Sequence, residues 1–124
     1  HIISSWNSVV TKKDVVFILG DITMEKHTPY HLLDKLNGIK KVILGNHDQP
    51  QHVPHLLKHV NSVCSCYQTK GIILTHIPIH ESEIQRFRKN VHGHVHENSL
   101  DDPRYVNVSC EVVDYKPVLL ENLI

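Results

Sequence analysis

Four short polar motifs, each placed after apolar residues, constrain the fold of this chain most strongly. In order, they are Gly20-Asp21, Gly45-Asn46-His47-Asp48, Thr75-His76 and Gly93-His94-Val95-His96. The first three follow short apolar runs typical of buried parallel strands, Val15–Leu19, Val42–Leu44 and Ile72–Leu74, and the fourth follows Val91. Side chains at the carboxyl ends of such strands point into the crevice where open α/β sheets bind ligands. The pattern therefore predicts an α/β fold with one site built from several loops.

Helices are expected to alternate with these strands. Helical periodicity, proline starts and a glycine stop predict helices over Ile2–Val10, Pro29–Gly38, Pro54–Val60 and Glu81–Phe87. Alternation and turn residues predict strands over Lys40–Leu44, Ser62–Tyr67, Gly71–Thr75 and Arg104–Cys110, while Val118–Ile124 fits a helix or a strand. Since the 124 residues contain no repeat and no linker, we expect one domain spanning residues 1–124.

The composition argues against several classes of protein. Thirteen basic and thirteen acidic side chains give a net charge of zero, without the basic block typical of nucleic-acid binding. We see neither an apolar stretch of the roughly 18 residues that a membrane span needs nor a signal peptide. The three cysteines, Cys64, Cys66 and Cys110, do not form a disulfide framework and favour a reducing compartment, so a cytoplasmic location is expected.

Taken singly, the polar motifs have ordinary explanations. His94 and His96 could be solvated loop histidines in a chain with twelve histidines, and Gly45–Asp48 could be a simple turn. A histidine at a strand end, such as His76, is more often structural. Their joint placement after strands changes that interpretation, because Asp, Asn and His together suit Zn, Mn, Fe or Mg. The combination predicts a metal-dependent hydrolase site.

On these four motifs the chain resembles the calcineurin-like metallophosphoesterases. That family's signature runs D-x-H, G-D, G-N-H-D or G-N-H-E, an isolated His, and G-H-x-H. Gly20-Asp21, Gly45–Asp48, His76 and Gly93–His96 match the last four blocks, and Val106–Pro117 is similar to the closing segment of small bacterial or phage members. The resemblance implies a four-layer α/β/β/α sandwich and hydrolysis of phosphomonoesters or phosphodiesters by a hydroxide held on a dinuclear metal site.

The resemblance also implies a role for each site residue. Asp21 would bridge two divalent ions, chosen from Mn, Fe, Zn or Ni. Asn46, His76 and His94 would complete the coordination of one ion, and His96 would bind the other. His47 would act as general acid or stabilise transition-state charge, with Asp48 orienting it. A two-metal site of this kind is physically suited to in-line attack on a phosphoester.

The family's first block, D-x-H, is not found in the nineteen residues before Gly20. Those residues begin with His1 and read as the helix after the family's first strand. We therefore expect an N-terminally truncated chain whose fold lacks that strand, and the activity of the chain itself is not assured. A one-metal or degenerate relative is the alternative.

Short spacings between the motifs leave no room for a large capping domain. We therefore expect an open site for a small phosphoester, a nucleotide or an exposed phosphodiester, and a homo-oligomer is possible. The alternative function is a non-catalytic metal-binding or interaction module on the same scaffold. A histidine-rich metal buffer is a weaker third hypothesis, because it does not require histidines at strand ends.

Overall fold

A computed structural model describes residues 2–19, 30–46, 48, 50–95, 98–109 and 117–123. Its elements, in chain order, are α1 (Ile2–Val9), β1 (Val15–Leu19), the 3-10 helix η1 (Tyr30–Lys35), β2 (Ile39–Ile43), the 3-10 helix η2 (Pro50–His52), α2 (Val53–Leu56), β3 (Ser62–Cys64), β4 (Tyr67–Thr69), β5 (Ile72–Leu74), α3 (Glu81–Ile84), β6 (Lys89–His92), β7 (Tyr105–Asn107) and the 3-10 helix η3 (Leu120–Asn122).

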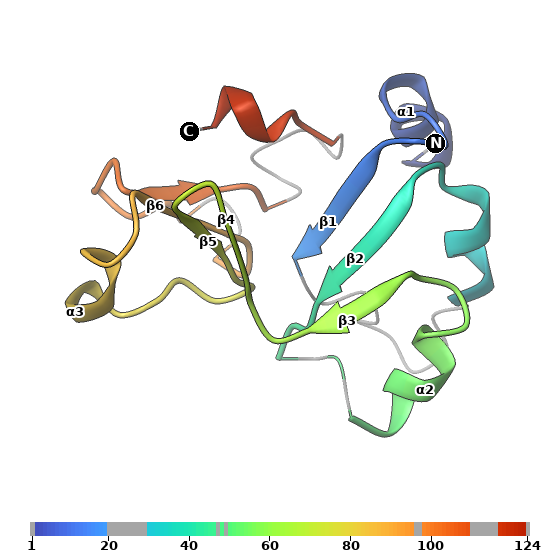
Figure 1. Cartoon of the computed structure of the whole chain (residues 1–124), viewed down its shortest axis with the longest axis horizontal. Helices are drawn as coiled ribbons and strands as arrows, with labels where there is room; N and C mark the ends of the chain where they lie inside the picture. The colour runs from blue at the N-terminus through green and yellow to red at the C-terminus, as the bar shows by residue number, and fades with distance from the viewer. Residues whose placement is uncertain are drawn as a thin grey trace.

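The strands form two small sheets (Figure 1). The first sheet, β1-β2-β3, is parallel, with Val15 opposite Ile39 and Ile43 opposite Cys64. The second sheet has the order β4-β5-β6-β7, with β4 antiparallel to β5 and the other pairs parallel. Because β1, β2, β5 and β6 are all followed by the predicted motifs, the parallel pairing gives each sheet a common carboxyl edge.

The first sheet has a hydrophobic cluster on each face, because neighbouring strand residues point in opposite directions. Leu33, Val42, Leu56 and Val60 form the helix-side core. Ile43, Ile72, Leu74 and Val91 form the inter-sheet core, which joins the two sheets. Val42 and Ile43 are consecutive residues of β2, and both are fully buried. Phe17 and Tyr67 extend the inter-sheet core, with their ring centroids 4.9 Å apart.

Several predicted elements are confirmed and one is divided. The β1 strand has the predicted bounds, β2 is shifted by one residue, and a strand surrounds Val91. The predicted strand Ser62–Tyr67 is instead split, because the chain leaves the first sheet after Cys64 and enters the second at Tyr67. The β4–β5 hairpin turns at Lys70 and Gly71, whose φ angles of 53° and 78° are the positive values that such tight turns use.

The expected four-layer α/β/β/α sandwich is wrong. The structure has two small sheets and few helices, so complete outer helical layers are not formed by the described residues. The helix predicted over Ile2–Val10 is confirmed as the eight-residue α1, but the other segments predicted as helices contribute the six-residue η1 and the four-residue α2 and α3. A four-residue helix is about 6 Å long, whereas a five-residue strand spans about 17 Å. Helices this short can cover a few side chains of a sheet, but they cannot cover a whole sheet face.

No helix in the described ranges is both long and apolar enough to cross a bilayer.

Candidate metal centre

His76 occupies the junction between the two sheets. It follows β5, and its side chain is buried. The ring Nδ1 lies 2.7 Å from the carbonyl oxygen of Leu19, at the end of β1, and Nε2 lies 2.9 Å from Oδ1 of Asn46, after β2. Because a carbonyl can only accept, Nδ1 carries the proton and donates it to Leu19. This bond fixes the tautomer and leaves the Nε2 lone pair directed at Asn46.

The contact between His76 and Asn46 tests whether a cation fits. In this tautomer Nε2 and the amide oxygen both offer lone pairs, so they repel unless a proton or a cation lies between them. Ligands at right angles around an ion, with bonds of about 2.1 Å, are about 3.0 Å apart. The observed separation of 2.9 Å agrees with that spacing. The pair is therefore suited to adjacent positions around a divalent ion.

His94 brings a second imidazole to the same place. Its ring centroid lies 5.0 Å from that of His76, and the two ring planes are inclined at 68°. The backbone of His94 adopts a φ of 70°, an uncommon value outside glycine that turns the chain sharply after β6. Gly93 is buried just before it, and a Cβ atom there would lie 3.3 Å from the Leu19 carbonyl oxygen. The missing side chain lets the ends of β1 and β6 approach closely.

The turn that carries Asn46 is closed by Asp48. The Asp48 carboxylate accepts a hydrogen bond of 2.9 Å from the backbone N–H of Gly45, and its own N–H donates to the Gly45 carbonyl at 3.1 Å. Asp48 is buried, whereas Asn46 is exposed at the tip. The predicted role of Asp48 was to orient His47. The structure adds a structural role, because the carboxylate shapes the turn that presents Asn46.

Three of the predicted metal ligands, Asn46, His76 and His94, therefore come together from loops that follow β2, β5 and β6. Asp21, His47 and His96 lie outside the described residues. Within the described ranges no three His, Cys, Asp or Glu side chains are grouped closely enough to hold a metal ion. The donor set described here is thus one amide oxygen and two imidazoles, and it is incomplete without a further ligand.

Sequence reasoning missed a set of polar residues beside the centre. Asn90 and His92 on β6 are fully buried and alternate with Val91, which points into the inter-sheet core. Burial lowers the pKa of His92, and the nearby His76 and His94 lower it further. Its Nδ1–H donates to the Gly93 carbonyl at 2.9 Å, while Nε2 has no partner among the described residues. The alternation of polar and apolar residues along β6 is the signal that could have identified them.

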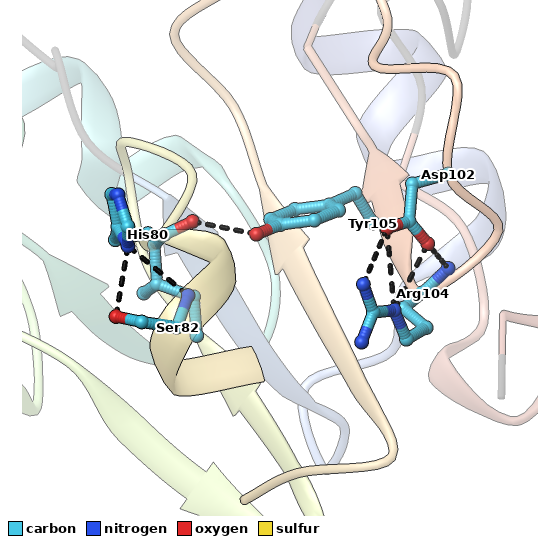
Figure 2. A network of polar contacts seen from close by, with 6 residues as sticks. His80, Ser82, Asp102, Arg104 and Tyr105 are labelled. Atoms are coloured by element: carbon cyan, nitrogen blue, oxygen red, sulfur yellow. Dashed lines mark hydrogen bonds and ion pairs between the residues drawn. The ribbon is translucent and has the colours of Figure 1, made fainter. Parts of the chain in front are cut away.

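Figure 2 shows the polar contacts next to this region. The Tyr105 hydroxyl donates to the Ile79 carbonyl at 2.8 Å, which ties β7 to the loop after His76. His80 is the N-cap residue of α3, and its Nδ1 accepts a hydrogen bond of 3.0 Å from the backbone N–H of Ser82. Hydrogen bonds from the Arg104 guanidinium hold the pKa of the Asp102 carboxyl below its usual value. Of these contacts, the Tyr105 hydrogen bond is the one that reaches the loop after His76.

Comparisons with known proteins place the chain among relatives from archaea and phages. No family model matches it. Uncharacterized protein MJ1445 of Methanocaldococcus jannaschii is 32% identical over 133 aligned positions, which cover 99% of this chain and 71% of the relative. The chain belongs to the family of MJ1445. The Gene 66 proteins of Mycobacterium phages D29 and L5 are 30% and 31% identical, and the matches cover 66% and 61% of their lengths.

A solved structure has the same arrangement. The protein of unknown function AQ665 from Aquifex aeolicus superimposes with a TM-score of 0.74 at 25% identity, over 99% of this chain and 83% of that one. The names of these relatives state no activity. The function is therefore argued from the chemistry of the site.

Proposed function

We propose that this protein is a metal-dependent hydrolase of phosphomonoesters or phosphodiesters. The observation that supports this most directly is the meeting of Asn46 Oδ1 and His76 Nε2 at 2.9 Å, with the His94 ring beside them. A neutral amide oxygen next to two imidazoles is a set of donors for a hard or borderline divalent cation. The motifs that carry these residues are those of the metallophosphoesterases that the sequence resembles.

The other residues of the motifs are assigned the roles that the resemblance implies. Asp21 would supply a carboxylate to the cations, and His96 would help to hold the second one. His47 stands next to Asn46 in the chain and donates a proton to the leaving group, while Asp48 holds the turn that carries both residues. Bound divalent cations supply Lewis acidity toward the phosphoryl oxygens. Leu19 keeps His76 in the tautomer that can bind a cation.

The exposure of Asn46 at the tip of its turn supports an open site. A small phosphoester, a nucleotide or an exposed phosphodiester end could reach such a position. The short connections between the motifs leave little chain for a covering domain.

Metal binding is the first test of this proposal. The 124-residue protein, stripped with chelator and titrated with Mn²⁺ in a calorimeter, should bind close to one equivalent. His76→Ala should abolish that binding, because it removes a donor whose geometry is fixed by Leu19. The matched control is His55→Ala, which removes an exposed histidine of α2 and should bind Mn²⁺ as the unchanged protein does.

Hydrolysis of nitrophenyl phosphate and bis-nitrophenyl phosphate is measured on the same proteins. We expect Mn²⁺-dependent turnover that His76→Ala removes, at a low rate, because the second cation is held only by Asp21 and His96. Metal binding without any hydrolysis would favour the non-catalytic module. Mn²⁺ binding that survives His76→Ala would contradict the ligand assignment.

A further inference from the structure

A buried asparagine clamps the loop that carries His76. Asn90 lies on β6, and its side chain is fully buried. Its Nδ2 donates to the Ile73 carbonyl at 3.1 Å and to the Thr75 hydroxyl at 3.0 Å, and its Oδ1 accepts from the Ile79 N–H at 3.0 Å. The side chain therefore binds β5 and both ends of the loop formed by residues 75–79.

Two further hydroxyl groups complete this clamp. The Thr75 hydroxyl donates to the Ile77 carbonyl at 2.7 Å, so it accepts from Asn90 and donates across the loop at once. The Tyr105 hydroxyl donates to the Ile79 carbonyl at 2.8 Å. Burial raises the pKa of Tyr105 above its ordinary value of 10, so the hydroxyl is a donor at neutral pH. The backbone groups at the exit of the loop are thereby fixed from β6 and from β7.

His76 lies inside the clamped loop and needs a defined direction. Its two ring nitrogens must reach Leu19, at the end of β1, and Asn46, in the turn that follows β2. A small rotation of the loop would break one of these contacts, since hydrogen bonds weaken steeply when their geometry is lost. Groups hydrogen-bonded to a metal-binding histidine, as the Leu19 carbonyl is to His76, typically change metal affinity by about 10- to 100-fold when they are altered. Residues that act one step further away, through the loop, should have a smaller effect.

We propose that Asn90, Thr75 and Tyr105 are positioning residues that hold the His76 loop in its cation-binding orientation. This inference rests on the proposed function of the site, since it assigns a purpose to the support of His76. None of the three residues needs to touch the cation or the substrate. Their polar groups are directed into the loop, which separates them from side chains that only fill the core.

The test removes single hydroxyl groups and leaves the packing nearly unchanged. Thr75→Val and Tyr105→Phe should each weaken Co²⁺ binding by up to about 10-fold, measured by visible absorption of the Co²⁺ complex. The matched controls are Thr69→Val and Tyr67→Phe on β4, at positions outside the clamp. We expect these controls to bind Co²⁺ as the unchanged protein does. Thr75→Ser restores the hydroxyl and should recover most of the affinity.

A metal-free measurement separates this inference from the proposed function. In chelator-treated protein, nitrogen-15 NMR of the imidazoles reports the His76 tautomer and the protection of its Nδ1–H. Thr75→Val should shift this signal and speed its exchange, whereas Thr69→Val should not. If the unchanged protein binds no Co²⁺, the proposed function fails and the NMR comparison alone decides the positioning role. Unchanged NMR signals, or equal Co²⁺ affinity in the clamp variants and their controls, would overturn the inference.

Discussion

The histidines of this chain differ in their burial and in the hydrogen bonds that their rings make. His76 is buried but has a partner at each ring nitrogen. His55, in contrast, is exposed on α2. His92 is fully buried, and burial lowers its pKa below the ordinary value of 6.5. The charge of a protonated His92 is therefore tolerated less well in the folded protein than in the unfolded chain.

The lowered pKa of His92 predicts a stability that depends on pH. Between the folded and the unfolded pKa, the unfolded chain binds more protons, so stability rises with pH. The contribution of His92 is fully present above about pH 6.5 and is lost as the pH falls through 6.5 toward the folded pKa. Urea unfolding of metal-free protein from pH 7.5 to 5 should show a steeper loss than for His92→Phe. His55→Phe is the control and should retain the full pH dependence.

Side chains of the site were easier to predict than the backbone groups that orient them. Asn46, His76 and His94 stand in recognisable motifs, and the structure brings the three together. The Leu19 carbonyl is equally necessary for the orientation of His76, but every residue carries a carbonyl, so the sequence gives no sign of it. Asn90 was missed for a related reason, because a polar residue inside a strand acquires its meaning only from the loop that packs on it.

At the scale of elements, strands were predicted better than helices. The β1 run consists of branched and aromatic residues, of which the partly buried Phe17, Ile18 and Leu19 pack against the two cores, so its bounds follow from composition. Helical periodicity predicts that Leu33 and Leu36 face the core, and they do. It does not distinguish an α-helix from a 3-10 helix, and this segment forms a 3-10 helix. The change of sheet between Cys64 and Tyr67 could not be predicted, because alternation in each short strand is the same whichever sheet it joins.

The turn between β2 and η2 is an element whose shape depends on one carboxylate. Asp48→Ala removes the acceptor for the Gly45 N–H and should lower the free energy of unfolding by roughly 1–3 kcal/mol. It should also weaken Mn²⁺ binding, because Asn46 loses its defined position. Asp48→Asn keeps an oxygen acceptor and should retain most of both properties. Calorimetric titration and urea unfolding give the two measurements, and equal loss of Mn²⁺ affinity in both variants would show that charge matters rather than the turn.

At the scale of the whole molecule, the two hydrophobic cores have different structural roles. The helix-side core holds helices against the first sheet, whereas the inter-sheet core sets the distance between the two sheets. Because the proposed metal centre draws on residues that follow strands of both sheets, we expect the inter-sheet core to determine its geometry more directly than the helix-side core. Loss of packing in either core should cost a similar amount of stability.

A matched pair of valines tests this difference. Val91→Ala in the inter-sheet core and Val42→Ala in the helix-side core both truncate almost fully buried side chains. Each should lower the free energy of unfolding by roughly 2 kcal/mol, from about 0.8 kcal/mol per lost methylene plus a cavity term. Only Val91→Ala should also weaken Mn²⁺ binding. Equal Mn²⁺ affinity in the two variants, measured by calorimetry, would show that sheet spacing does not govern the site.

The contact between Leu19 and His76 has a consequence for the folding of the protein. It joins residues 57 positions apart, and the contact between Asn46 and His76 spans 30. Neither sheet alone contains all three donors. An ion that needs all of them would therefore bind only the folded protein. Such an ion adds to the stability of the native state by mass action, in proportion to the logarithm of its free concentration. If the proposed site holds a cation, the concentration of free cations should affect the fraction of newly made chains that stays folded.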